Sequence, residues 1–162
     1  YNSFEKKYRV NAIYNKNFER KSVAFQRLLA NEIILNRSKF DLIDKKFNKK
    51  KYFSSIRQSK VVLSLFGWGE VCYRDWESVI LGSPFIKPDM SYLETWPNIY
   101  IPNETYYSVK LSLENLQDVI NLSVSSSKKS INMIKNSQDI IKSIRLNNGK
   151  IFCEKFLQII KI

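Results

Sequence analysis

The sequence contains no histidine, and this absence excludes several kinds of chemistry. Without imidazole, neither a Ser-His-Asp triad nor a Cys-His pair can form. Histidine-based zinc and iron sites are excluded, and so is the most common general base. Any reaction that this chain catalyses must therefore depend on carboxylates, cations, backbone groups or the substrate itself.

Cysteine and long apolar runs are also scarce. The two cysteines, Cys72 and Cys153, lack the spacing of a metal site or a disulfide framework. We interpret both as reduced packing residues, which favours a reducing compartment. No stretch approaches the roughly 18 apolar residues that indicate a membrane-spanning helix. We therefore expect a cytoplasmic protein, with peripheral contact to a membrane as an option.

Positive charge, in contrast, is abundant and uneven. The net charge is +12, and residues 1–60 hold 16 Lys/Arg against 5 Asp/Glu. Such a basic half is compatible with nucleic acid, an anionic membrane surface or an anionic ligand. Because no aromatic-interleaved RNA motif accompanies the charge, we do not expect nucleic acid as the partner. A solvated, lysine-rich surface is the simplest interpretation, and contact of residues 1–60 with an anionic membrane remains open.

The hydrophobic pattern predicts one domain of alternating strands and helices. The chain has 162 residues and is 44% hydrophobic, which is enough for a core. The predicted strands span residues 8–14, 40–43, 61–66, 84–87 and 105–109, and the predicted helices span 18–35, 49–58, 70–81, 112–122, 128–144 and 151–160. This order predicts an α/β fold over residues 1–162: a Rossmann-like three-layer sandwich with a mainly parallel sheet and C-terminal helices at 128–162.

The most informative segment is residues 66–77, which follow the apolar run 61–65. A buried strand, a glycine loop and a helix start offer backbone N–H groups to a phosphate, here beside Gly67 and Gly69. The predicted helix 70–81 carries three charged residues within about 60° on one face: Glu70, Arg74 and Glu77. The opposite face is expected to pack against the sheet through Cys72, Tyr73, Trp76, Val79 and Ile80. The segment therefore indicates a nucleotide-type ligand.

These residues resemble a known family. The segment 64–77, SLFGWGEVCYRDWE, is followed by Gly82 and by residues 86–97, IKPDMSYLETWP. Together they resemble the C-terminal half of glycosyltransferases with the GT-B fold, in particular the bacterial and viral glycosyltransferase family 1 or exostosin-like group. The resemblance covers about residues 56–122.

The sequence departs from the family pattern at several positions. Retaining members often carry two glutamates with seven residues between them, and then a glycine and a proline. Glu77 and the downstream Gly82 and Pro84 fit the second half of that pattern, but only six residues separate Glu70 from Glu77. Leu65 stands where relatives often have proline, and Tyr92 stands where they often have histidine.

The resemblance implies a glycosyltransferase, or its donor-binding lobe. Such an enzyme transfers a sugar from a nucleotide-sugar donor to a hydroxyl acceptor, for example a glycan or cell-surface polysaccharide. By analogy, Glu77 would hold the ribose hydroxyls and Glu70 would contact the donor sugar. Metal-dependent glycosyltransferases usually need an Asp-x-Asp pair, which this sequence lacks, so we expect no metal and no cofactor besides the donor.

The expected roles of the remaining site residues follow from the chemistry of such a donor. Gly67 and Gly69 allow the backbone to approach the diphosphate closely. Arg74 or Lys87 can neutralise the leaving phosphate, so Arg74 joins Glu70 as an expected catalytic residue and Lys87 joins the donor-binding set. Four further residues are candidate donor or acceptor contacts: Trp68, Tyr73, Ser91 and Thr95.

Alternatives to an active enzyme remain open. The chain has room for one of the two lobes of a GT-B enzyme, so we expect the N-terminal acceptor lobe to be absent from it or to belong to a partner chain. A second hypothesis is a basic module that binds nucleic acid or another anionic polymer through residues 1–60. A third is a non-catalytic α/β scaffold for a protein partner, in which the Glu70–Arg74 pair and the tryptophans serve surface and packing roles.

Overall fold

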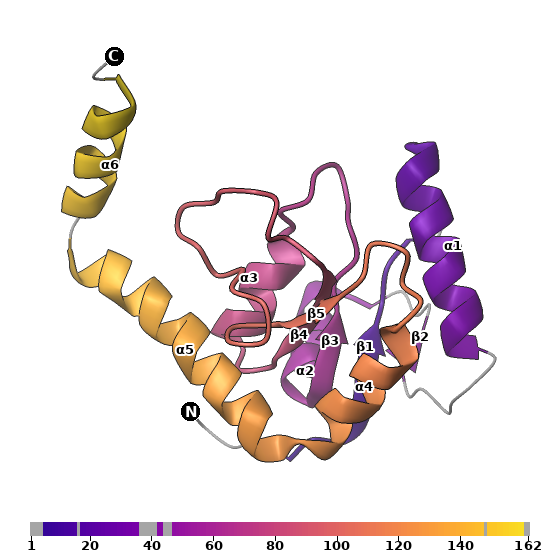
Figure 1. Ribbon diagram of the computed structural model, residues 1–162. Coiled ribbons are helices and arrows are strands. Elements are labelled where there is room, and N and C mark those ends of the chain that lie inside the picture. The colour runs from indigo at the N-terminus through magenta and orange to yellow at the C-terminus, as the bar shows by residue number, and fades with distance from the viewer. Residues whose placement is uncertain (1–4, 16, 36–41, 44–46, 148, 161–162) are drawn as a thin grey trace.

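The computed structural model describes residues 5–15, 17–35, 42–43, 47–147 and 149–160. Five parallel strands form one sheet in the order β2-β1-β3-β4-β5 (Figure 1). The strands are β1 (Tyr8–Ala12), β2 (Leu42–Ile43), β3 (Ser59–Leu63), β4 (Phe85–Pro88) and β5 (Tyr107–Val109). The register pairs Val10 with Val61, Val62 with Phe85, and Ile86 with Tyr107.

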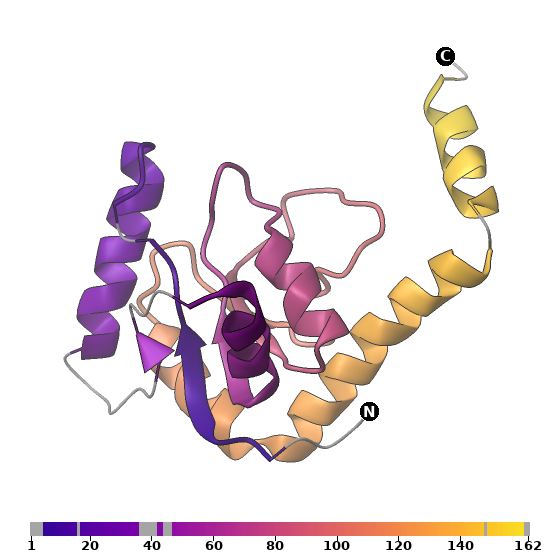
Figure 2. The same ribbon diagram turned by 180° about the vertical axis from the view of Figure 1, so that it is seen from behind.

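Helices cover both faces of the sheet. They are α1 (Lys21–Leu35), α2 (Lys49–Arg57), α3 (Tyr73–Ile80), α4 (Leu116–Ser125), α5 (Ser127–Leu146) and α6 (Lys150–Ile160). One hydrophobic cluster joins the sheet to α1 and α4, and the other joins it to α2, α3 and the segment 90–106. Helix α4 lies in front of the sheet in Figure 1, and α2 lies in front of it in Figure 2, which shows the opposite side. The predicted α/β three-layer sandwich is confirmed.

The apolar run in β3 explains this layering. Val61 and Leu63 belong to one hydrophobic cluster, whereas Val62 belongs to the other. Because successive side chains of a strand point to opposite faces, a continuous apolar run needs cover on both faces. All three side chains are fully buried, as this arrangement requires.

Several predicted boundaries are wrong. Helix α3 begins at Tyr73 rather than at residue 70, because Cys72 has an extended backbone (φ −120°, ψ 145°) and the residues before it form a loop. The helix predicted from residue 112 begins at Leu116. The break predicted at 123–127 narrows to Ser126, the residue between α4 and α5. Helix α3 ends at Ile80, one residue before the predicted end, and Gly82 lies just beyond the cap residue Leu81 with φ of +74°.

Helix α6 stands away from the sheet at the end of α5 (Figures 1 and 2). None of its described side chains is buried, and the ring of Phe152 contacts that of Trp96 at 5.5 Å between centroids. Cys153 is exposed on this helix, so its expected packing role is wrong. No helix in the described part of the chain is both long and apolar enough to cross a membrane.

The order of the strands creates one position suited to a ligand. Strand β1 lies between β2 on one side and β3 on the other. The connections that leave β1 and β3 therefore run in opposite directions, toward β2 and β4, and a crevice forms where the carboxyl ends of β1 and β3 separate. The loops that begin at Ile13 and Ser64 meet at this topological switch point.

Candidate functional site

A cavity of about 360 Å³ opens at the switch point. Its walls come from the segment after β1, from α1 and α2, and from the loop and helix after β3. The lining residues are Phe18, Arg27, Tyr52, Leu65, Gly67, Trp68, Gly69, Val71, Cys72, Tyr73, Arg74 and Glu77. The structure therefore brings together six of the predicted site residues, namely Gly67, Trp68, Gly69, Tyr73, Arg74 and Glu77, and adds Arg27 and Tyr52.

Arg27 joins the two loops that flank the switch point. Its Nη1 donates to the Asn15 carbonyl at 2.7 Å, and its Nη2 and Nε donate to the Phe66 carbonyl at 2.9 and 3.2 Å. The guanidinium also lies over the ring of Phe18, with 4.4 Å to the ring centroid. Only 7% of Arg27 is exposed, so its remaining N–H groups have little access to water outside the cavity.

Arg74 approaches the same space from α3. Its Nη2 donates to the Ile13 carbonyl, and its Nε lies 3.4 Å from the hydroxyl oxygen of Tyr52. Arg27 and Arg74 line the same cavity, so their positive charges repel each other. Burial lowers the pKa of Arg27, and the charge of Arg74 lowers it further. Neither forms an ion pair with a carboxylate in the described part of the chain. An anion placed between them would relieve this repulsion.

Glu77 supplies an acidic group to the cavity. Its Oε2 accepts a hydrogen bond from the Tyr52 hydroxyl at 2.9 Å. The side chain lines the cavity and is partly buried, rather than pointing into the hydrophobic interior. A carboxylate in this position can accept hydrogen bonds from the hydroxyl groups of a ligand.

Aromatic side chains form the outer wall. The rings of Trp68 and Phe18 lie 5.3 Å apart at a tilt of 60°. Trp68 is 63% exposed and Tyr73 is 89% exposed, so neither is part of the core. Exposed rings beside two cations can pack against a planar or apolar part of a ligand.

Lys87 does not line the cavity and is not available to a ligand. Its Nζ is 3.0 Å from Asp75 Oδ2, and neither side chain has any exposed surface. Asp75 also accepts hydrogen bonds from Ser64 Oγ, Tyr100 OH and the Cys72 N–H, at 2.5, 2.7 and 2.9 Å. The expected contact between Lys87 and the donor phosphate is therefore wrong: Lys87 neutralises a buried carboxylate.

The glycine loop leaves fewer backbone N–H groups free for an anion than predicted. The Gly67 N–H donates to the Gly69 carbonyl at 3.1 Å, and Asp75 already occupies the N-terminus of α3. The positive charge at the cavity therefore comes mainly from Arg27 and Arg74, and not from a cradle of backbone N–H groups.

Glu70 does not share a helix face with Arg74 and Glu77. It lies in the loop before α3, where it is exposed and outside the lining of the cavity. The predicted grouping of these three residues is wrong because it assumed a helix from residue 70. A catalytic role for Glu70 stays a prediction.

The face of α3 that packs against the sheet also differs from the prediction. Tyr73 and Ile80 are exposed, whereas Asp75 and Ser78 are fully buried with Val79. Polar groups can face the core here because they are paired: Asp75 as described above, and Ser78 through a bond from its Oγ to the Arg74 carbonyl at 2.7 Å. Cys72 is partly buried, and burial raises the pKa of its thiol.

The other two predicted contacts lie apart from the cavity lining. Ser91 is exposed and donates to Asp89 Oδ2 at 2.8 Å, in a separate hollow at the carboxyl ends of β4 and β5. Thr95 Oγ1 lies 3.3 Å from Asn98 Oδ1 within the segment between β4 and β5. The structure does not bring either residue to the two arginines.

Sequence reasoning missed Arg27 and Tyr52, although each left a signal. Arg27 lies on the same face of α1 as Val23, Ala30 and Ile34, all of which are buried. A charged residue on an apolar stripe needs a specific partner, and such a residue is a candidate for a functional site. Tyr52 carries a hydroxyl on the buried side of the otherwise basic helix α2, which indicates a polar partner in the same way.

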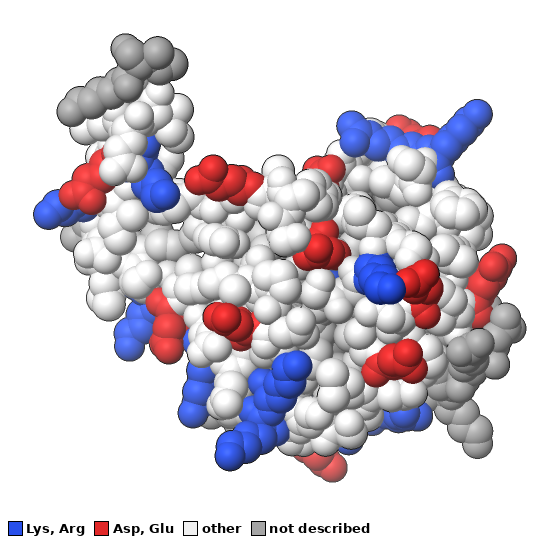
Figure 3. Space-filling view, viewed as in Figure 1, with Lys and Arg blue, Asp and Glu red and all other residues white. Residues whose placement is uncertain are grey.

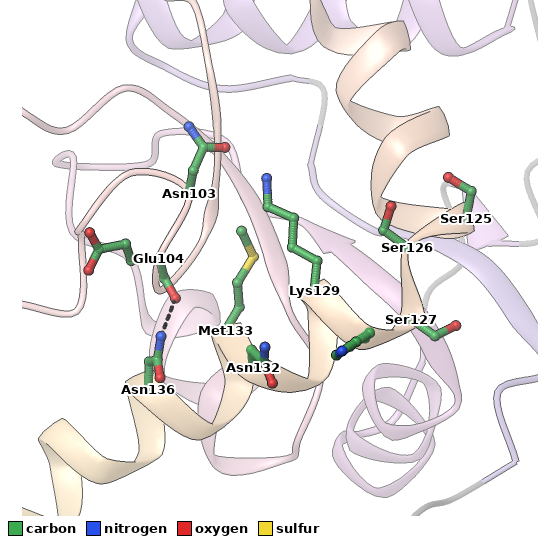
Figure 4. Close-up of a pocket in the computed structure, with 10 residues that line it drawn as sticks. Asn103, Glu104, Ser125, Ser126, Ser127, Lys129, Asn132, Met133 and Asn136 are labelled. Carbon is green, nitrogen blue, oxygen red and sulfur yellow. Dashed lines mark hydrogen bonds between the residues drawn. The ribbon is translucent and has the colours of Figure 1, made fainter.

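A larger hollow of about 660 Å³ lies at the junction of α4 and α5 (Figure 4). It is lined by serine, asparagine and lysine residues together with Glu104 and Met133, and Asn136 Nδ2 donates to the Glu104 carbonyl at 3.0 Å. It lies beside residues that precede β5, away from the carboxyl ends of the strands where open α/β sheets bind ligands. We therefore take the smaller cavity as the candidate site.

Two further observations concern the chemistry of the surface. Among the described residues, no group of three or more acidic, cysteine or histidine side chains is arranged to hold a metal ion. On the face shown in Figure 3, cationic side chains gather near the upper end of α1 and near the junction of α4 and α5, with acidic side chains between them. This interspersed pattern suits a long polyanion less well than a continuous basic stripe would.

Comparisons with protein-family models, curated proteins and solved structures found no match to this chain.

Proposed function

We propose that the chain is the donor-binding lobe of a glycosyltransferase, which binds a nucleotide sugar in the cavity at the switch point. The observation that carries this proposal is a pair of arginines, the buried Arg27 and the partly buried Arg74, that line one cavity without a carboxylate partner among the described residues. Two such cations in a shared space suit a diphosphate. The sequence resemblance described above supports the same class of ligand.

The remaining groups of the cavity match the other parts of such a donor. Glu77 offers carboxylate oxygens to the ribose hydroxyls, and the Trp68 and Phe18 rings offer apolar surface to the base or the sugar. This assignment keeps Glu77 and Arg74 in their predicted roles and adds Arg27 as a second phosphate contact in place of Lys87.

The proposed reaction needs charge stabilisation at the diphosphate. The bond between the anomeric carbon and the diphosphate oxygen breaks, and its electron pair stays on the leaving nucleoside diphosphate. Arg27 and Arg74 would stabilise this negative charge. The acceptor hydroxyl forms the new bond to the anomeric carbon, and its proton passes to a base that we assign to the second lobe. The nucleotide-sugar substrate fits a cytoplasmic location.

Calorimetric titration with UDP, GDP, ADP and their sugar conjugates tests the proposal. We expect saturable binding of at least one of them. Arg27→Met and Arg74→Met should each weaken it by roughly 10- to 100-fold, the range expected for a hydrogen bond to a charged group. Arg145→Met removes an exposed arginine from α5 and is the matched control that should bind as the unaltered protein does.

Other outcomes would favour the alternative hypotheses. Absence of binding to every nucleotide would overturn the proposal and favour a scaffold. Binding to polynucleotides that falls steeply with salt, and that Arg27→Met leaves unchanged, would favour a basic polymer-binding module.

A further inference from the structure

Tyr52 connects the two charged groups that α3 sends into the cavity. Its hydroxyl accepts from Arg74 Nε at 3.4 Å and donates to Glu77 Oε2 at 2.9 Å. Because a hydroxyl has one proton, the contact with Arg74 directs that proton toward the carboxylate. The result is a chain of hydrogen bonds from Arg74 through Tyr52 to Glu77.

The position of Tyr52 holds these hydrogen bonds in a fixed geometry. Tyr52 lies on α2, and its ring packs at the edge of the hydrophobic cluster that α2 shares with α3. Burial raises the pKa of Tyr52, so the hydroxyl remains a donor at neutral and mildly alkaline pH. The hydroxyl is thus fixed by packing on one helix while it holds a carboxylate on another.

Tyr52 engages one of the two carboxylate oxygens of Glu77. Oε2 is engaged by Tyr52, whereas no hydrogen bond to Oε1 is seen among the described residues. A glutamate side chain without such a partner would sample several rotamers, and ordering it on ligand binding would cost free energy. With Tyr52 in place, the carboxylate already faces the cavity in one orientation.

We propose that Tyr52 is a positioning residue that sets the selectivity of this site for a ribose with its hydroxyl groups intact. This inference rests on the proposed function, because it assumes that Glu77 accepts hydrogen bonds from the ribose. The proposal requires no contact between Tyr52 and the reacting atoms. It acts by holding Glu77 in the geometry that two neighbouring hydroxyls require.

The test compares ribose and deoxyribose ligands. The nucleoside diphosphate that binds best among UDP, GDP and ADP is titrated beside its 2′-deoxy and 2′,3′-dideoxy forms. The unaltered protein should prefer the ribose form by about tenfold or more, since the deoxy forms leave a carboxylate oxygen without a partner. Tyr52→Phe, which keeps the ring, should lower that preference to about threefold or less.

Two further variants separate positioning from general stability. Glu77→Gln should abolish most of the preference, and Tyr52→Phe/Glu77→Gln should behave as Glu77→Gln alone because the two residues act through one contact. Tyr92→Phe removes a hydroxyl from an exposed tyrosine outside the cavity and should leave the preference unchanged.

The possible results distinguish the two proposals. If no nucleoside diphosphate binds, the proposed function fails, and this inference fails with it. If binding occurs and Tyr52→Phe weakens the ribose and deoxyribose ligands equally, only the role of Tyr52 is overturned, because a purely structural effect does not depend on the ribose hydroxyls.

Discussion

Asp75 and Lys87 form an ion pair with no exposed surface, between the start of α3 and the end of β4, with 3.0 Å between Oδ2 and Nζ. The pair is part of a larger network, since Tyr100 also donates to Asp75 Oδ2 at 2.7 Å. Burial and the neighbouring Asp75 carboxylate raise the pKa of Tyr100, which keeps its hydroxyl protonated as a donor. The core therefore holds a satisfied polar network at the start of α3, the helix that carries Arg74 and Glu77.

Removing one member of this ion pair should strongly destabilise the protein. Lys87→Met leaves the Asp75 carboxylate buried without its counter-ion, and we expect the free energy of unfolding to fall by about 3–5 kcal/mol. Asp75→Asn/Lys87→Met removes both charges, and we expect it to be less destabilising than Lys87→Met. Urea denaturation followed by circular dichroism measures both.

Lys110→Met is the matched control for this prediction. Lys110 pairs with Glu114 on the surface, where both side chains are mostly exposed. An exposed pair of this kind contributes about 0–1 kcal/mol. If Lys87→Met proved no more destabilising than Lys110→Met, the buried network would not contribute to stability as predicted.

Two neighbouring aliphatic residues of α3 test which face of this helix is buried. Val79 is 2% exposed and belongs to the core, whereas Ile80 is 66% exposed, although the sequence pattern placed both against the sheet. Val79→Ala should cost about 1–3 kcal/mol, because it leaves a cavity in the core. Ile80→Ala should change the free energy of unfolding by less than about 0.5 kcal/mol. Equal losses in the two variants would mean that the helix is rotated from the orientation described.

The fold was predictable because its signal is local and repeated. The run Val61-Val62-Leu63 is buried on both faces in the structure, as a continuous apolar run in a parallel sheet requires. Gly67, Arg74 and Glu77 could be assigned to one site because they are close in sequence. The start of α3 was missed because helical periodicity alone does not show that Cys72 has an extended backbone.

The partners of the site residues were not predictable from local pattern. Arg27 meets the Phe66 carbonyl 39 residues away, and Tyr52 meets Glu77 25 residues away. Both contacts depend on the order of the strands, which places α1 and α2 beside the loop after β3. Lys87 was misassigned for the related reason that its partner, Asp75, is recognisable only once α3 is packed against β4.

The stability of the protein should depend on pH through Lys6. Its Nζ donates to the Arg57 carbonyl at 2.9 Å and to Ser83 Oγ at 2.9 Å, near the ends of α2 and α3. Burial lowers the pKa of Lys6 from 10.5 to about 8. Between these two values the unfolded chain binds more protons than the folded one, so folding becomes more favourable as pH rises through this window.

A comparison with Lys6→Met isolates this contribution. From about pH 7 to pH 10, the free energy of unfolding of the unaltered protein should rise relative to that of Lys6→Met by on the order of 2 kcal/mol. Lys7→Met removes an exposed lysine and should show no such difference. A gap between the unaltered protein and Lys6→Met that stays constant over this range would contradict the lowered pKa.

Gly67 and Gly69 allow the ligand site to be tested without disturbing the fold. A Cβ added at Gly67 would lie 3.5 Å from Cys72 Sγ and 3.9 Å from Arg27 Nη2, which are ordinary contact distances. A Cβ added at Gly69 would meet nothing within 4 Å. Neither glycine has a positive φ, so alanine introduces no backbone strain at either position. We expect the free energy of unfolding of both variants to lie within about 0.5 kcal/mol of that of the unaltered protein.

Ligand binding should distinguish the two glycine variants. The methyl group of Gly67→Ala would lie beside the Arg27 guanidinium, in the space that we assign to the diphosphate, and should weaken nucleotide binding by about tenfold or more. Gly69→Ala adds the same group to open space and should weaken binding by less than about threefold. Calorimetric titration of the two variants measures the difference. If Gly67→Ala bound the nucleotide as tightly as Gly69→Ala does, the phosphate would have to lie away from Arg27, and the assignment of this cation to the donor site would be wrong.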